Sequence, residues 1–158
     1  KGIIKSLGQT GQEGEQKDGM DMSLVSLEVM LDGKKINVKL SYAGANNSLY
    51  ILRKGVLIEL NADKMPIGIY LGLEKPFKNN EMLLETGDTI YLFSDGYADQ
   101  FGGAKGKKFT KKRFKDLLIS LQSQPMNKHK VILETTMDEW LGDQQQIDDV
   151  LIIGIRIS

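Results

Sequence analysis

Hydrophobic and polar positions alternate along much of the first half of the chain. The segment from Met22 to Leu31 is rich in Val and Leu, and residues 35–44 alternate apolar and polar side chains at a period of two. Between them stands Asp32-Gly33, a dipeptide that is typical of tight hairpin turns. The pattern therefore predicts two antiparallel strands joined at this turn.

The same pattern recurs in shorter runs further along the chain. The apolar runs 47–53 and 56–60 are separated by Lys54-Gly55, which predicts a second hairpin. Residues 65–73 contain a proline and two glycines, so we expect a shaped loop with short extended pieces. A turn at Gly87-Asp88 leads into a strand from Ile90 to Ser94, and a last strand is expected over residues 150–157.

The clearest helical spacing occurs in residues 110–142. A first helix is predicted from Thr110, a suitable N-cap, to Ser123, and a second one follows Pro125 and ends near Gly142. The apolar residues of the first helix recur at helical spacing with lysines opposite; they are Phe114, Leu117, Leu118 and Leu121.

The order of these elements predicts the fold class. Strands come first, a helical pair follows, and one strand returns at the end, which indicates an α+β domain of mainly antiparallel sheets, with a β-sandwich core flanked by helices. Residues 1–158 are expected to form a single domain. In it, residues 1–17 form the end of a helix and a flexible, glycine-rich loop, which extends to Gly19.

Composition and charge narrow the classes of function. A chain of 158 residues with 41% hydrophobic residues has the size and core of one globular unit. Its 21 Lys and Arg residues balance 21 Asp and Glu residues, so no global field attracts nucleic acid. We therefore expect no nucleic-acid partner.

The absence of cysteine and of long apolar runs bears on the kind of metal and on the cellular location of the protein. The absence of cysteine leaves carboxylates, carbonyls and the single His129 as ligands, which favours magnesium, manganese or calcium over zinc. No apolar run approaches the roughly 20 residues that span a bilayer. We expect a cytoplasmic segment without membrane contact, excised from a parent protein that could carry a membrane anchor elsewhere.

Two acidic positions adjoin apolar strands. Asp95-Gly96 follows the strand at residues 90–94, and Asp148-Asp149 precedes the apolar run 150–155. A buried strand fixes the direction of a carboxylate at its end, and Gly96 permits a sharp turn that lets an ion approach. Two such sites in one small domain indicate divalent-metal chemistry, although a single Asp-Gly after a strand is more often an ordinary turn.

Five motifs in this order resemble one protein family. They are DGMDMSLV at residues 18–25, YAGANNSLYILRKG at 42–55, MPIGI at 65–69, GDTIYLFSDGYAD at 87–99 and QIDDVLIIGI at 146–155. The chain is similar to the C-terminal part of bacterial metal-dependent serine/threonine protein phosphatases of the SpoIIE and RsbU type, in the PPM superfamily. The resemblance implies a partial PPM-type fold.

The resemblance also implies roles for particular residues. Asp95 and Asp148 would bind metal, in a centre of two manganese or magnesium ions that activates a water for attack on a phosphoserine or phosphothreonine. Gly96, Asp99 and Asp149 would support the metal site. Asp99 is equally well explained as a solvated loop acid, and Asp149 as a local hydrogen-bonding residue.

One motif of the family is missing. The family has an early aspartate in an Asp-x-x-Gly-His-Gly context, which does not occur in this sequence. We therefore expect the parent to be a phosphatase in signal transduction, while this piece alone binds metal weakly and is inactive. The resemblance implies an upstream sensory domain and a phosphoprotein substrate such as an anti-sigma antagonist-like regulator.

Other interpretations remain open at this stage. The parent could be a catalytically dead phosphatase-like binding module, or an unrelated calcium-binding domain in which Asp95, Asp99, Asp148 and Asp149 form one cage. An incomplete sheet could pair with a second copy as a homodimer. The lysines of residues 105–115 fit a solvated helix face, or less readily a docking patch for a substrate.

The environments of five further residues are predicted. We expect His129 on the surface of a helix and Trp140 in the core or against a helix. Gly44, Asn46 and Asn47 are expected to shape a turn between strands.

Overall fold

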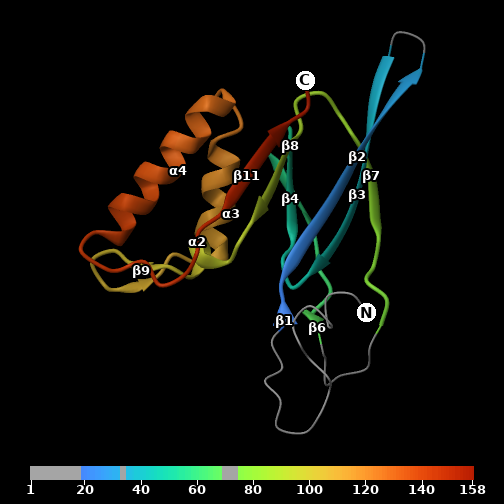
Figure 1. The fold of residues 1–158 in the computed structure, drawn as a ribbon. Coiled ribbons are helices and arrows are strands. Elements are labelled where there is room, and N and C mark those ends of the chain that lie inside the picture. Colours follow the sequence, from blue (N-terminus) through green and yellow to red (C-terminus); the bar gives the residue numbers. More distant parts are fainter. Residues whose placement is uncertain (1–18, 33–34, 69–74) are drawn as a thin grey trace, which may run out of the picture. The chain divides into compact units, whose positions relative to one another are not determined.

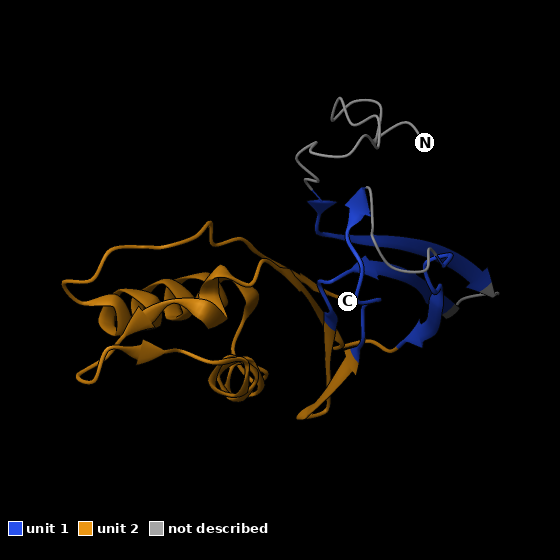
Figure 2. Cartoon of the chain, turned by 90° about the horizontal axis from the view of Figure 1, so that it is seen from below, with its two compact units in different colours: residues 1–49, 60–84 blue, residues 50–59, 85–158 orange. Residues whose placement is uncertain are grey.

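The computed structural model describes residues 19–32, 35–68 and 75–158. The chain divides into two compact units, of which the first comprises residues 1–49 and 60–84 and the second residues 50–59 and 85–158 (Figure 2). The expectation of a single domain over residues 1–158 stays a prediction.

A three-stranded antiparallel sheet forms most of the first unit. β2 (Met22–Asp32) and β3 (Lys35–Ala45) pair along their whole length, with Asp32 opposite Lys35, and β7 (Asn80–Leu84) pairs with the other edge of β3. β1 (Gly19–Met20) and β6 (Ile67–Gly68) form a small separate ladder. The hairpin predicted around residues 32–33 is confirmed, because side chains of period two fit a sheet with one buried face.

The turn after β3 depends on close packing of backbone and side chain. The Tyr42 hydroxyl donates a hydrogen bond to the Asn47 carbonyl at 2.6 Å, and a Cβ placed on Gly44 would lie 2.1 Å from that hydroxyl. Asn46 adopts a φ of 59°, in the left-handed region that asparagine tolerates. The predicted turn is confirmed, and only glycine fits at position 44.

The second unit combines a four-stranded antiparallel sheet with two helices. The strand order is β11-β8-β4-β5, formed by β11 (Ile152–Arg156), β8 (Thr89–Phe93), β4 (Leu49–Arg53) and β5 (Val56–Leu60). α3 (Lys111–Ser120) and α4 (Met126–Leu141) lie beside this sheet (Figure 1). The buried cluster joining strands and helices is Tyr50, Leu52, Tyr91, Tyr97, Phe109, Phe114, Leu118, Leu121 and Leu133.

Both predicted helices occur, with the expected cap residues Thr110 and Gly142, although α3 ends at Ser120 rather than at Ser123. The Thr110 hydroxyl accepts a hydrogen bond from the Arg113 backbone N–H at 3.4 Å, and Gly142 follows α4 with a φ of 54°. The α+β class with antiparallel sheets is thereby confirmed. Trp140 is half-buried against the core and donates from Nε1 to the Gln100 carbonyl, also as predicted.

Three short elements between β8 and α3 were not predicted. They are α2 (Gly96–Asp99), β9 (Phe101–Gly102) and β10 (Lys107–Lys108). One turn of helix and a two-residue ladder are too short to give a periodic pattern, so the sequence does not predict them. β9 lies against Trp140, whose carbonyl would be 1.9 Å from a Cβ on Gly102.

The prediction that His129 lies on the surface is wrong. Its side chain is buried in α4 at 3% exposure, where Nδ1 is 2.8 Å from the Tyr91 hydroxyl and Nε2 is 3.0 Å from the Gln124 carbonyl. Arg156 completes the network from β11, with Nη2 3.3 Å from Nε2. Because both ring nitrogens find partners, the imidazole is satisfied inside the unit.

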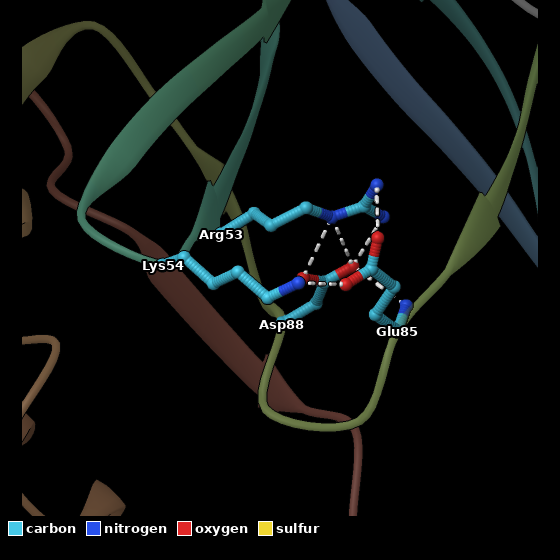
Figure 3. Close-up of polar contacts among 4 residues, drawn as sticks. All are labelled: Arg53, Lys54, Glu85 and Asp88. Atoms are coloured by element: carbon cyan, nitrogen blue, oxygen red, sulfur yellow. Dashed lines mark hydrogen bonds and ion pairs between the residues drawn. The ribbon is translucent and has the colours of Figure 1, made fainter.

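An ion-pair cluster ties the turn after β4 to the turn before β8 (Figure 3). Arg53 makes a forked contact with the buried Asp88, with Nε 3.0 Å from Oδ1 and Nη2 2.6 Å from Oδ2. Asp88 also accepts from the Glu85 backbone N–H at 2.8 Å, while Lys54 and Arg53 both contact the Glu85 carboxylate. The cluster fixes the Gly87-Asp88 turn from which β8 departs.

Some predictions fall outside the described residues. These are the helix end and most of the loop over residues 1–17, the tip of the first hairpin and part of the loop at 65–73. Among the described residues, no helix is long and apolar enough to cross a bilayer.

Candidate active site

The two acidic segments lie at the same end of neighbouring strands. Antiparallel pairing places Ile152, the first residue of β11, opposite Phe93, the last residue of β8. Asp95 follows β8 as the N-cap of α2, and Asp148 precedes β11 by a few residues. The chain reversal between residues 95 and 148 therefore returns one acidic segment to the other.

Ser94 joins the two segments directly. Its backbone N–H donates to the Leu151 carbonyl at 3.0 Å, and its hydroxyl donates to the Asp149 carbonyl at 2.7 Å. The same hydroxyl accepts from the Leu151 N–H at 2.9 Å. These three hydrogen bonds extend the ladder between β8 and β11 by one residue, up to the acids themselves.

Gly96 allows the segments to approach so closely. A Cβ at this position would lie 2.4 Å from the Asp149 carbonyl oxygen and 3.0 Å from its carbonyl carbon. Both atoms belong to backbone, which cannot rotate away as a flexible side chain can. The glycine of the Ser-Asp-Gly triplet is therefore required by the opposite acidic segment.

The carboxylates at this corner face solvent. Asp95, Asp148 and Asp149 are all exposed, and the Asp95 side chain makes no capping hydrogen bond to α2. Asp148 Oδ1 accepts from the Asp149 N–H at 2.7 Å, and its carbonyl accepts from Gln146 Nε2. The backbone around these acids is held, while their side chains remain accessible to a ligand.

Asp99 has a different environment from the other three acids. Its N–H donates to the Asp95 carbonyl within α2, and its carboxylate forms an ion pair with Lys108 Nζ at 3.0 Å. The side chain therefore links α2 to β10. Its assignment as a supporting residue stays a prediction.

The chemistry and the number of these acids decide whether they suit a metal ion. Exposed carboxylates suit manganese and magnesium. The described part of the chain contains no group of three or more acidic or histidine side chains placed to hold one ion. Asp95, Asp99, Asp148 and Asp149 therefore do not form one cage, and the calcium-site hypothesis is wrong. The donors are of the right kind for a metal pair but too few to complete it.

Sequence reasoning missed two residues that shape this corner. Ser94 bridges the segments, and Gln100, which is fully buried, accepts from the Ile147 N–H at 3.2 Å and donates to the Gln145 carbonyl at 3.0 Å. Gln100 thus holds the loop that leads to Asp148. The sequence around Gln100 gave no signal of this role. Ser94 could have been found, because it belongs to the Ser-Asp-Gly triplet that contains Asp95.

A cavity of about 440 Å³ lies next to this corner, between α4 and β11. Its walls are mostly apolar and include Tyr91, Leu133, Met137 and Ile152. The Tyr91 and Tyr97 hydroxyls that reach it are already bonded to His129 and the Leu133 carbonyl. The lining also includes the polar side chains Lys130, Glu134, Asp138 and Gln146, but none of Asp95, Asp148 and Asp149, which remain the candidate site.

Comparison with known proteins assigns the chain to a family. The family model of stage II sporulation protein E (SpoIIE) matches residues 3–158. This chain belongs to the SpoIIE family. The resemblance inferred from the five motifs is thereby confirmed.

Solved structures agree with this assignment. The SiaA-PP2C domain of Pseudomonas aeruginosa is 31% identical with a TM-score of 0.69, over 78% of this chain and 51% of that one. The PP2C phosphatase domain of SpoIIE from Bacillus subtilis, solved with a fragment of its regulatory domain, is 18% identical with a TM-score of 0.56, over 80% and 39%. A manganese-presoaked form of the SpoIIE phosphatase domain is 16% identical with a TM-score of 0.53, over 84% and 56%.

These structures share the mixed α+β fold of PP2C-type phosphatase domains. The chain spans about half the length of the solved structures it matches. No curated protein sequence matches it significantly.

Proposed function

We propose that this chain is part of a metal-dependent phosphatase domain that removes phosphate from serine or threonine of a regulatory protein. The observation that carries the proposal is the Ser94 bridge, which brings the Asp95 segment against the Asp148-Asp149 segment. Membership in the SpoIIE family and the likeness to PP2C-type domains support the reaction class.

Each residue has a defined part in this proposal. Asp95 and Asp148 hold divalent manganese or magnesium, and two such cations would supply an activated water and offset negative charge on the phosphoryl group. Gly96 permits the close approach, Asp149 contributes the carbonyl that Ser94 binds, and Asp99 orders α2 through Lys108. One of the similar SpoIIE phosphatase domains was presoaked with manganese, which is consistent with this choice of metal.

The described residues supply only part of this site. They contain no group of three potential ligands, and the matched structures are about twice as long as the matched region. We propose that residues of the parent protein outside this chain provide the remaining acids. The chain alone is then expected to bind manganese weakly and to hydrolyse little or no phosphopeptide.

The proposed setting is bacterial signal transduction in the cytoplasm. The substrate would be a phosphorylated regulator of the anti-sigma antagonist type, under control of an upstream sensory domain. The SpoIIE structure solved with part of its regulatory domain is consistent with such an arrangement. A homodimer through an open sheet edge is also compatible with the free edges of the two sheets among the described residues.

Metal titration of single variants tests the proposal. Isothermal titration with Mn²⁺ is performed on the chain, on Asp95→Asn and on Asp148→Asn, with Asp143→Asn as a control. Asp143 is an exposed acid in the loop after α4. Both site variants should abolish the weak heat of binding while the control retains it. Equal binding by all four proteins would refute the assigned ligands.

Phosphopeptide hydrolysis by the parent protein separates the enzyme from its alternative. The small number of acids at the corner favours a second candidate function, a catalytically dead module that binds phosphoprotein. An active parent that loses turnover in Asp95→Asn supports the phosphatase. A parent that binds phosphopeptide without manganese and without hydrolysis supports the binding module.

A further inference from the structure

Positive charge is concentrated in one short stretch of this otherwise balanced chain. Seven of its 21 Lys and Arg residues lie between residues 105 and 115, and no acid lies among them. Three are engaged within the second unit: Lys108 pairs with Asp99, Lys115 pairs with Glu59 at 2.7 Å, and the Arg113 guanidinium lies 4.5 Å from the Trp140 ring centroid.

We call the other four cations, which are close together in sequence, the basic patch. Its members are Lys105, Lys107, Lys111 and Lys112, all of them exposed. Within the described part of the chain, no acidic side chain forms an ion pair with any of them. Their charge is therefore available to a partner.

Helix electrostatics do not explain this concentration of charge. Lys111 and Lys112 occupy the first turn of α3, which contains no acid. Cations at this end oppose the helix dipole, so acids would serve the stability of α3 better. A solvated helix face accounts for exposed lysines in general, but not for their gathering at the end where they are least favourable.

The basic patch adjoins the candidate active site. The Thr110 N–H donates to the Ala98 carbonyl at 2.7 Å, and the Phe109 N–H donates to the Gln100 carbonyl at 2.9 Å. These two hydrogen bonds hold the segment just before α3 next to α2. α2 begins one residue after Asp95. Figure 1 shows α2, β9 and the start of α3 at the end of the second unit where β8 ends and β11 begins.

We propose that the basic patch docks an acidic segment of the phosphoprotein substrate, next to the residue that is dephosphorylated. This inference rests on the proposed function. Charge complementarity supports an acidic segment, and the contacts between α2 and the segment before α3 place that segment within reach of the acids.

The surrounding charges favour a protein over a nucleic acid. A strand of RNA carries evenly spaced phosphates, which the exposed carboxylates of Asp95, Asp148 and Asp149 would repel. A polypeptide, unlike RNA, can carry its acidic residues opposite the lysines and none opposite the three aspartates. The arrangement of cations beside acids therefore selects a segment with localised negative charge.

Binding of a phosphate-free peptide tests the basic patch independently of catalysis. The probe is a short fluorescein-labelled peptide rich in Glu, compared with the same peptide carrying Gln, and anisotropy is measured without added metal. The variants are Lys111→Glu with Lys112→Glu, and Lys105→Glu with Lys107→Glu. The control is Lys128→Glu with Lys130→Glu, which makes the same charge change at exposed positions early in α4.

The expected result is selective loss of affinity. The chain and the control should bind the Glu peptide equally and more weakly as salt increases, whereas each patch variant should bind about tenfold more weakly. Glutamates in the first turn of α3 should not lower its melting temperature, which circular dichroism checks. Absence of binding, equal loss in the control, or stronger lysine-dependent binding of poly-uridine RNA would overturn the proposal.

These outcomes are distinct from failure of the proposed function. The peptide carries no phosphate and the assay contains no manganese, so the result does not depend on Asp95 or Asp148. Loss of metal binding in the aspartate variants tests the phosphatase, and the lysine variants should leave that binding unchanged.

Discussion

The Ser94 hydroxyl donates a hydrogen bond to the Asp149 carbonyl at 2.7 Å and so connects the two acidic segments of the chain. The same oxygen accepts from the Leu151 N–H at 2.9 Å. A single side chain thus sets the spacing between residues that are 55 positions apart in sequence. This contact supplements the pairing of β8 with β11, which brings the Asp95 segment to the Asp148 segment.

Ser94→Ala should therefore loosen the corner without unfolding the second unit. Loss of a hydroxyl that makes two hydrogen bonds at a partly exposed site should cost about 1–2 kcal/mol and weaken Mn²⁺ binding. Urea unfolding and metal titration measure the two effects. Ser120→Ala is the control, because that exposed hydroxyl bonds only to the Leu117 carbonyl in its own helix. Equal effects of both substitutions would contradict the assigned role of Ser94.

Gly96→Ala should separate the acidic segments. The new Cβ would lie 2.4 Å from the Asp149 carbonyl oxygen, and relieving this overlap of rigid backbone should cost about 1–3 kcal/mol despite the better helix propensity of alanine. The matched control is Gly154→Ala, whose Cβ would lie 3.0 Å from the flexible end of Met126 and 3.3 Å from the Tyr91 ring, with no backbone atom among its three nearest contacts. Thermal melts should show a clear loss for position 96 and a small change for position 154. A reversed order would contradict the packing described here.

Asp88→Asn should destabilise the second unit strongly. Asp88 is 1% exposed and balances the charge of Arg53, whose pKa is raised by the hydrogen bonds that Asp88 accepts. Removing the charge of one partner from this buried pair should cost about 2–3 kcal/mol in denaturant titrations. Glu85→Gln, at a half-exposed member of the same cluster, should have a much smaller effect. Similar losses for both variants would show that burial does not govern the cluster.

Alkaline pH should weaken the fold through its buried tyrosines. Burial raises the pKa of the Tyr91 hydroxyl to about 12, and it also raises the pKa values of Tyr50 and Tyr97. Because the folded-state pKa of Tyr91 lies above the unfolded value of about 10, its contribution to stability is complete below pH 10. That contribution is then lost as pH rises from 10 toward 12.

The variant Tyr91→Phe isolates this contribution. Urea unfolding measured from neutral pH to pH 12 should give a shallower alkaline decline for the variant than for the unaltered chain. At neutral pH the variant should be less stable, because His129 loses the hydroxyl bonded to Nδ1. An identical alkaline slope for both proteins would show that Tyr91 does not titrate in this range.

The strands and the two long helices could be predicted from local patterns. A Val- and Leu-rich segment, an Asp-Gly turn signal and the alternation over residues 35–44 predicted a hairpin, and the structure pairs Met22 with Ala45 through to Asp32 with Lys35. Period and turn residues suffice here because each strand buries one face and each turn needs a particular backbone. α2, β9 and β10 escaped because elements of two to four residues carry no period.

Side-chain environments were predicted less well than elements. His129 was expected on the surface of a helix, yet it contacts Tyr91 and Arg156 inside the unit. Gln100 is buried for a similar reason, since it bonds to a loop that lies 45 residues later in sequence. Burial of a polar residue depends on a partner that its own segment does not contain.

The sequence by itself determined the longer hairpin strands, the two long helices, the absence of thiolate ligands and the family, because each depends on residue types or their local order. It also indicated Asp95 and Asp148, since both adjoin buried strands. Only the tertiary structure decided that Ser94 and Gly96 allow the segments that carry these acids to lie close together. It also decided that four exposed lysines near α2 have no acidic partner among the described residues. Such relationships arise from antiparallel pairing of β8 with β11 and from packing between α2 and the start of α3, and sequence spacing does not encode the distances that result.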